Sequence, residues 1–295
     1  MRIGVPLQKP EHQEHWYSYG DGCLAVEEFN PPGSEQKEGS SCTLLFLHGR
    51  FGQAEVWGPL LKKVSGRFRC LNMDLPGFGR SFSVRGRGYS LLEQAKLVRQ
   101  VIQRFALKGQ RLVLVGHDTG GAVAQLCALQ ETESVRGLVL INSAALTEPP
   151  SYFKTGFFSL RARLMLKHLS RLGSRKESPE HRLLMRDWAN HARRASMVQA
   201  FHAWENTWPG PVERRRFREE VSKLRQPVLL LWGRRDPMSP FDHARELMRY
   251  LPDGYLFENE ESGHWPCFEE PDWVELKIRE FLFMLGATQS ARRGA

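Results

Sequence analysis

Short apolar runs alternate with amphipathic stretches along most of this chain. Stretches such as Leu91–Phe105 place apolar residues three and four positions apart, a spacing that predicts helices with one buried face. Buried strands that alternate with helices predict an α/β fold, with a mostly parallel sheet flanked by helices. The strand-like runs are Thr43–Leu47, Phe68–Met73, Leu112–Val115, Val135–Ile141, Val228–Trp232 and Tyr255–Phe257, and the other predicted helices of this part are Gly121–Leu129 and Val274–Leu285.

The N-terminal part departs from this alternation. Trp16–Tyr19 and Cys23–Phe29 alternate loosely around Gly20–Gly22, which predicts an antiparallel hairpin. Asn30–Ser41 is rich in Pro, Gly and Ser and predicts a loop.

The segment 147–226 has no strand-like run, and its pattern predicts several helices, including Tyr152–Leu172 and Ser178–Ala203. It lies between two successive strands of the predicted sheet, so we expect it to form an excursion above that sheet. The predicted organisation is therefore a core made of residues 1–146 and 227–295, with an inserted helical cap, or lid, at 147–226.

Composition restricts the class of protein. With 295 residues, 41% hydrophobic and 25% charged, the chain is typical of a globular protein. No apolar run approaches the roughly 20 residues of a membrane span, and the polar stretch Met1–His15 gives no sign of a secretory signal. The five cysteines are odd in number and form no CxxC pair, which favours free thiols in a reducing compartment. We therefore expect a cytoplasmic protein, and no metal-ligand spacing is present.

The positive charge is concentrated in the predicted lid. Ser151–Arg225 holds 17 Lys/Arg and 7 Asp/Glu, a local net of +10, so the remainder contributes −1 to the total of +9. Solvated helix faces explain such a segment most simply. It could also attract an anionic substrate or associate weakly with an anionic membrane surface. No nucleic-acid-binding module is recognisable, so we expect no nucleic-acid partner.

The most informative stretch is Gly116-His117-Asp118-Thr119-Gly120-Gly121. It follows a buried strand and precedes a helix, and its small residues allow the sharp turn of a G-x-nucleophile-x-G elbow. Aspartate stands where serine is usual. A carboxylate is ionised at neutral pH and can displace a leaving group from saturated carbon. Helix N-capping is the simpler role for an aspartate here.

Two further residues follow strands of the same predicted sheet. Asp236 comes directly after the Val228–Trp232 run, and His264 follows Tyr255–Phe257. Because such folds bind ligands at the carboxyl ends of their strands, both side chains can reach the crevice next to Asp118. N-capping explains neither of these residues nor the glycines, so we favour a catalytic role for Asp118.

Five motifs, in order, resemble the α/β-hydrolases, specifically the branch with an aspartate nucleophile. That branch includes haloalkane dehalogenases, soluble-type epoxide hydrolases and fluoroacetate dehalogenases. The motifs are Leu44–Gly49, Asp74–Ser81, Val115–Gly121, Leu231–Pro237 and Gly263–Pro266.

The resemblance implies a triad of Asp118, His264 and Asp236. Asp118 would attack an electrophilic carbon of a small to medium, apolar small-molecule substrate, and His264, oriented by Asp236, would activate water against the resulting ester. The backbone N–H groups of Arg50 and Thr119 would form the oxyanion hole. This chemistry needs no cofactor or metal. His48 and His117 occupy positions that are structural in the family.

Subfamily signatures are incomplete. Thr119 replaces the tryptophan that dehalogenases and many epoxide hydrolases carry after the nucleophile, and Arg50 replaces the asparagine of one dehalogenase group. The elbow helix lacks the arginine that fluoroacetate dehalogenases use. Epoxide opening usually relies on two lid tyrosines, whereas this lid has Tyr152 as a candidate leaving-group donor. Its histidines are possible substitutes: His168, His181, His191 and His202.

Three functions remain open at this stage. The favoured one is an alkyl-ester mechanism, with epoxide oxygen preferred over halide because residue 119 offers no tryptophan donor. The second is an ester or lactone hydrolase in which Asp118 is a general base. The third is a non-catalytic binding protein on a hydrolase scaffold, which the intact triad disfavours.

Overall fold

The computed structural model describes residues 12–30, 42–50, 52–83, 88–105, 107, 111–143, 199–200, 203 and 210–293. Its strands are β1 (His12–Tyr19), β2 (Gly22–Phe29), β3 (Cys42–Leu47), β4 (Arg69–Met73), β5 (Phe82–Ser83), β6 (Arg111–His117), β7 (Val135–Ile141), β8 (Val228–Gly233) and β9 (Gly254–Asn259). Its helices are η1 (Ala54–Trp57), α1 (Gly58–Val64), α2 (Leu91–Arg104), α3 (Thr119–Gln130), α7 (Pro211–Val221), α8 (Phe241–Met248), α9 (Pro266–Glu269) and α10 (Pro271–Arg293).

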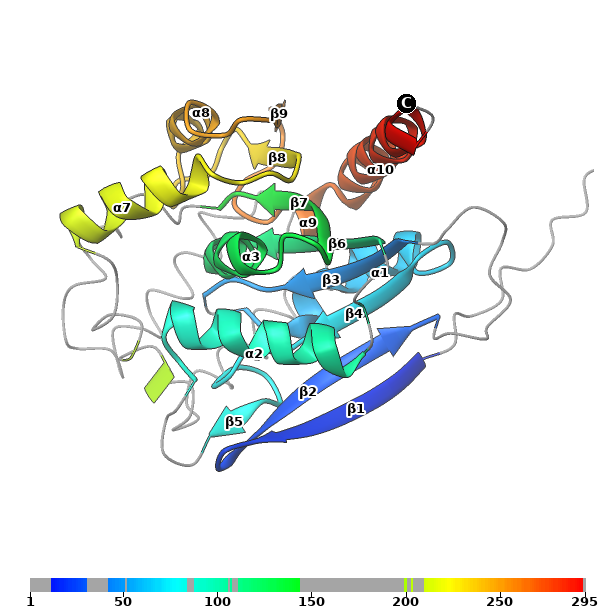
Figure 1. Cartoon of the computed structure of the whole chain (residues 1–295), viewed down its shortest axis with the longest axis vertical. Helices are drawn as coiled ribbons and strands as arrows, with labels where there is room; N and C mark the ends of the chain where they lie inside the picture. Colours follow the sequence, from blue (N-terminus) through cyan, green and yellow to red (C-terminus); the bar gives the residue numbers. More distant parts are fainter. Residues whose placement is uncertain are drawn as a thin grey trace, which may run out of the picture.

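The described strands form one sheet in the order β1-β2-β4-β3-β6-β7-β8-β9, with β5 paired to β2 (Figure 1). The pairs from β4 through β9 are parallel. The hairpin β1–β2 joins them antiparallel, with Tyr19 opposite Gly22. The predicted fold class, a mostly parallel sheet flanked by helices, is confirmed.

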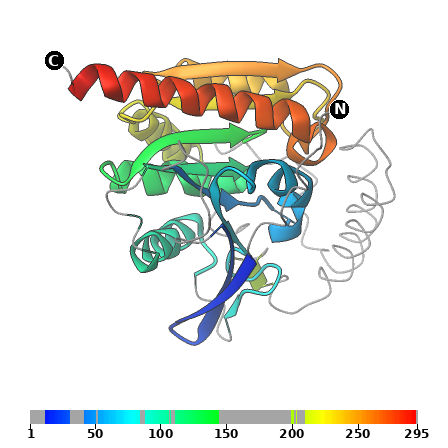
Figure 2. The ribbon, with the colours of Figure 1, turned by 90° about the vertical axis from the view of Figure 1, so that its right-hand side faces the viewer.

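Both faces of the sheet are covered, as the long apolar strands require. In Figure 1, α2 and α3 lie in front of the sheet and α1 behind it, while Figure 2 shows α10 running beside β9. Successive residues of one strand pack on opposite sides: Leu45 joins the α2–α3 cluster, and Leu44 and Phe46 join the α1–α10 cluster.

Two helix starts show how local sequence sets the elements. Ser90 caps α2, since its hydroxyl accepts the Glu93 N–H while the Glu93 carboxylate accepts the Ser90 N–H. In α1, Pro59 occupies the first turn, where a missing N–H costs nothing.

Most of the predicted lid, including Tyr152 and its histidines, lies outside the described residues. Its described C-terminal part contains α7, which contacts α3 of the core. Val221 and Leu224 join the apolar cluster on that side of the sheet. This end of segment 147–226 is thereby anchored to the core, close to the helix that begins after Asp118.

Candidate active site

The three proposed triad residues lie at the carboxyl edge of the parallel sheet. Asp118 follows β6, Asp236 follows β8 and His264 follows β9. The structure buries all three side chains, with residue exposures of 1%, 5% and 2%. This is the edge at which α/β folds place their ligands.

Asp118 occupies a strained turn between β6 and α3. Its φ of 47° and ψ of −120° are rare for a residue with a side chain. The turn is held by the Asp118 N–H, which donates to Ile141 O at 3.1 Å, and by Ser143 Oγ, which donates to Asp118 O at 2.9 Å. Strain of this kind persists where surrounding contacts over-determine the backbone, typically at functional sites.

The alternative role of Asp118 as a helix cap is not supported by its contacts. Although it precedes α3, its side chain makes no capping hydrogen bond to that helix. The carboxylate instead faces the chain after β3. Gly49 makes this approach possible, because a Cβ at that position would lie only 2.5 Å from Asp118 Cβ.

Arg50 provides the main contacts of the Asp118 carboxylate. Its backbone N–H donates to Asp118 Oδ2 at 3.0 Å, so this half of the predicted oxyanion hole is in hydrogen-bond contact with the carboxylate. Its guanidinium also reaches the carboxylate, with Nε donating to Oδ2 at 3.2 Å and Nη2 donating to Oδ1 at 3.3 Å. The pair is buried, with Arg50 only 7% exposed. Sequence reasoning assigned no role to this side chain.

His264 is oriented by a carboxylate and an amide. Its Nδ1–H donates to Asp236 Oδ2 at 2.7 Å, which leaves Nε2 as the nitrogen able to accept a proton. Asn142 Nδ2 donates to the same oxygen at 2.6 Å, while its Oδ1 accepts the Gly233 N–H at 2.9 Å. Asp236 Oδ1 accepts the N–H groups of Met238 and Ser239.

Asn142 is a site residue that sequence reasoning missed. It follows β7 with a φ of 42°, a left-handed conformation that asparagine tolerates better than most residues. The sequence did contain a signal for Asn142, because it stands directly after a buried strand. That strand neighbours the strand that precedes Asp236.

Neighbouring charges shift the pKa values of Asp118 and His264 in opposite directions. Burial would raise the pKa of Asp118, but the Arg50 guanidinium and His264 outweigh it and lower this pKa to about 2. Burial would lower the pKa of His264, but Asp236 outweighs it and holds this pKa above the usual 6.5. At neutral pH, the side chain of residue 118 is therefore an ionised carboxylate.

The two other histidines make structural contacts. His48 Nδ1–H donates to Gly49 O at 2.9 Å and its Nε2 accepts the Leu75 N–H, which holds the loop before Arg50. His117 Nε2–H donates to His264 O at 2.7 Å, and burial lowers the pKa of His117 to about 4. His117 thus positions the backbone that carries His264.

Thr119, predicted to supply the second oxyanion N–H, is only 1% exposed and begins α3. Within the described residues, its amide makes no hydrogen bond to the Asp118 carboxylate, so that half of the prediction remains open. Its Oγ1 is also buried there without a hydrogen-bond partner.

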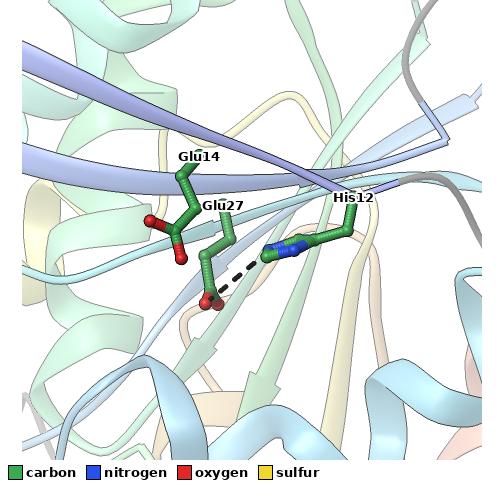
Figure 3. Close-up of side chains that lie close together, drawn as sticks. All are labelled: His12, Glu14 and Glu27. Carbon is green, nitrogen blue, oxygen red and sulfur yellow. Dashed lines mark ion pairs between the residues drawn. The ribbon is translucent and has the colours of Figure 1, made fainter.

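In the described part of the chain, one group of side chains offers metal-ligand atoms: His12, Glu14 and Glu27 on the β1–β2 hairpin, within 4.8 Å of one another (Figure 3). The Arg80 guanidinium already pairs with Glu14 at 3.2 Å and with Glu27 at 3.1 Å. Asn72 Nδ2 donates to Glu27 as well. We interpret this group as an ion-pair network that fastens the hairpin to the chain after β4.

Comparison with known proteins agrees with the predicted fold. The model of the alpha/beta hydrolase family matches residues 44–275, and the chain belongs to that family. It is 29% identical to AB hydrolase superfamily protein YisY of Bacillus subtilis (strain 168), over 81% of this chain and 90% of that protein. It is 26% identical to haloalkane dehalogenase 2 of Mycobacterium tuberculosis (strain ATCC 25618 / H37Rv), over 82% and 88%.

Among solved structures, the epoxide hydrolase CorEH superposes with a TM-score of 0.70 at 18% identity, covering 93% of this chain and 100% of that one. At this identity the likeness shows the fold alone. The protein is an α/β-fold hydrolase by family and architecture. Among the described residues, no helix has both the length and the apolar character needed to cross a bilayer.

Proposed function

We propose that this protein is a hydrolase that forms an alkyl ester at Asp118. The observation that carries the proposal is a carboxylate at the strained elbow, with a pKa of about 2, beside the His264–Asp236 pair. Asp118 attacks an electrophilic carbon and releases the leaving group. His264 Nε2 then takes a proton from water, which attacks the ester carbonyl and regenerates the carboxylate.

The same pKa weighs against Asp118 as a general base in an ester or lactone hydrolase. A carboxylate with a pKa of about 2 is a weak base toward water. Displacement at carbon requires only that the carboxylate be ionised. The likeness to haloalkane dehalogenase 2 also supports displacement, because the proposed first step is of that type.

Between leaving groups, we favour an epoxide oxygen over a halide. An oxygen leaving as an alkoxide needs an O–H donor that can give up its proton. Tyr152, in the lid and outside the described residues, is the candidate for this donor. The buried Thr119 hydroxyl can donate a hydrogen bond at most, because a threonine hydroxyl is not acidic. Halide removal would need side-chain N–H donors aimed at the leaving ion. Position 119 lacks the tryptophan that supplies one, and the Arg50 Nε and Nη2 groups donate to Asp118 itself.

The test is to trap the ester. His264→Gln removes the base for hydrolysis but leaves Asp118 in place, so the variant should alkylate once and stop. Intact-protein mass then reports the chemistry. An epoxide adds its full mass because ring opening expels nothing, whereas a chloroalkane adds its mass less HCl.

His264→Gln/Asp118→Asn is the matched control and should gain no mass, since an amide is a poor nucleophile. Peptide mapping of the adduct should place it on Asp118. A wild type that turns over an epoxide, an ester or a chloroalkane while His264→Gln stays unmodified would refute the two-step mechanism. Turnover of aryl esters alone would instead favour the general-base hydrolase.

A further inference from the structure

Strand β9 is an edge of the sheet, and among the described strands none pairs with its outer side. Its inner side bonds to the chain of β8. The Asp253 carbonyl accepts the Val228 N–H and the Asn259 carbonyl accepts the Arg234 N–H, each at 2.8 Å. Backbone groups alternate in direction along a strand, so every second residue from Asp253 to Asn259 faces β8.

The backbone groups of the residues in between, Gly254, Leu256 and Glu258, therefore face away from β8. A row of outward N–H and C=O groups is a template for another strand, and proteins usually protect such an edge with charges or proline. Strand β9 has no proline, and Glu258 is its one charged residue. This edge is therefore poorly protected against pairing.

An apolar groove of about 590 Å³ runs beside this edge, between β9 and α10. Tyr255 and Phe257 line it from the strand, and Phe281 and Phe283 line it from the helix. Figure 2 shows α10 running along β9. Phe283 is 80% exposed and Phe257 is 38% exposed. Exposed aromatic side chains that gather along a groove are typical of a surface that binds a partner.

Strand β9 is complementary to a second copy of itself. In an antiparallel pair with a two-fold axis at Leu256, the two Leu256 residues exchange both of their N–H···O bonds, and Gly254 of each copy does so with Glu258 of the other. Tyr255 of one copy then lies opposite Phe257 of the second copy, an aromatic cross-strand pair of a stabilising kind. The acidic Glu258 faces a glycine, so no like charges oppose each other within the strand pair.

The charges beside the strand are complementary in the same arrangement. The Asp253 carboxylate, which accepts a hydrogen bond from the Tyr255 hydroxyl, raises the pKa of Tyr255. Lys277 Nζ lies 4.4 Å from the centre of the Phe257 ring. Because Tyr255 of one copy lies opposite Phe257 of the other, the pairing brings the Asp253 carboxylate toward the Lys277 ammonium of the second copy. The two-fold axis repeats this contact, so opposite charges meet twice.

We propose that the surface formed by β9 and the groove beside α10 is an interface between two copies of this chain. The two β9 strands pair antiparallel about Leu256 and continue the sheet from one copy into the other. The two α10 helices then flank the pair on one face, where Phe283 covers the aromatic groups of the second copy. The inference is independent of the proposed reaction, because this surface contains none of the triad residues.

The first test is sedimentation equilibrium of wild type and Leu256→Pro over a series of concentrations. The Leu256 N–H faces outward, so proline there removes donors of the dimer and keeps the bonds to β8. Wild type should sediment as a dimer. Leu256→Pro should raise the dissociation constant by roughly 10²-fold or more, because symmetry removes two hydrogen bonds at once. An unchanged circular dichroism spectrum shows that the variant folds.

Ser18→Pro is the matched control on the opposite edge strand, β1. Tyr19 pairs with Gly22 across a two-residue turn, so the exposed Ser18 directs its N–H away from β2. This change should leave the dimer intact. If Ser18→Pro dissociates the dimer as strongly as Leu256→Pro, a general weakening of the sheet would explain both effects and the role of the β9 edge would be refuted.

The second test examines the register by disulfide formation. Tyr255→Cys and Phe257→Cys are prepared separately and oxidised alone and as a mixture. In the proposed register these two positions lie opposite each other with Cα atoms about 4.5 Å apart, which a disulfide can bridge. The mixture should therefore cross-link, whereas each variant alone should not. Wild type, with its five free cysteines, is oxidised in parallel to measure the background.

Three results would overturn the proposal. A wild type that stays monomeric at every concentration would leave the groove to another occupant, such as an apolar segment of a different protein. A dimer that survives Leu256→Pro would show that the β9 edge does not join the copies. Cross-linking of Tyr255→Cys alone to the same extent as the mixture would contradict the pairing about Leu256.

Discussion

At the scale of single residues, the two groups proposed to act in successive steps have opposite pKa shifts. Asp118 is held at a pKa of about 2, and the pKa of His264 is held above 6.5. The first step requires a deprotonated carboxylate and the second requires a neutral imidazole. The two steps should therefore respond differently to pH.

We predict that alkylation is nearly independent of pH from about pH 5 to pH 9, because Asp118 stays ionised far above its pKa. Ester hydrolysis should rise with pH as His264 loses its proton. The Asp118 charge helps to raise the pKa of His264, and the ester lacks this charge. Hydrolysis should thus show a lower pKa than His264 has in the free enzyme. Single-turnover quench measurements at several pH values separate the two rates.

Asp236→Asn serves as the control for this pH profile. Asp236 is the main group that raises the pKa of His264. In the variant, ester hydrolysis should therefore begin to rise at a lower pH, and the maximum rate of hydrolysis should fall. An alkylation rate that declines together with hydrolysis at acidic pH would contradict the separation of roles.

Single residues also mark where sequence reasoning ends. Asp118, Asp236 and His264 could be placed at one sheet edge because each follows a strand, and strand ends are readable from apolar patterns. The guanidinium of Arg50 could not be placed. Its contact with Asp118 spans 68 positions of sequence and depends on how closely two loops approach. Asn142 was missed for the same reason, since its partner Asp236 is 94 positions away.

At the scale of elements, the sequence predicted the buried strands and long helices well and the short helices poorly. Leu91–Phe105 was predicted and α2 spans Leu91–Arg104, because its apolar spacing has one clear period. By contrast, α1 and α8 went unrecognised. Each begins next to a proline, at Pro59 and Pro240, and a proline resembles a loop signal when the following helix is short.

The elbow offers an element-scale prediction. A Cβ at Gly116 would lie 2.5 Å from Gly121 Cα and 2.6 Å from Gly120 O, both backbone atoms of α3. Gly116→Ala must therefore push α3 away from β6, and we expect it to lower the free energy of unfolding by roughly 2–4 kcal/mol. Urea denaturation monitored by circular dichroism measures this loss.

Gly58→Ala is the matched control for the elbow. Gly58 has helical dihedral angles, φ −48° and ψ −50°, and a Cβ there meets no atom within 4 Å. This change should be neutral or stabilise the protein by about 0.5–1 kcal/mol, since alanine loses less backbone entropy in a helix. Equal changes in the free energy of unfolding at both positions would show that close packing at the elbow is not the reason why position 116 is a glycine.

At the scale of the whole molecule, the role of the uneven charge distribution is the question that the sequence alone left most open. Segment 151–225 carries a net charge of +10, and its described helix α7 lies against α3, the helix that begins after Asp118. Arg214 is buried in α7, whereas Arg215 and Arg216 are exposed. Removing all three charges would mix a packing effect with an electrostatic one, so the exposed pair is the better probe.

We predict that kcat/KM for an anionic substrate falls roughly 3- to 10-fold between low and high salt, because screening shortens the reach of the positive field. Arg215→Gln/Arg216→Gln should flatten this salt dependence and lower kcat/KM at low salt, with kcat little changed. The control Lys62→Gln/Arg279→Gln removes two positive charges from α1 and α10, on the opposite side of the sheet, and should keep the wild-type slope. A carboxamide analogue should show no salt dependence in any variant.

Equal slopes for the two double variants would mean that the position of the charge does not matter and that net charge alone attracts the substrate. A wild type without any slope would leave the basic segment with no part in substrate capture, and cosedimentation with anionic vesicles would then test whether it binds membrane surfaces.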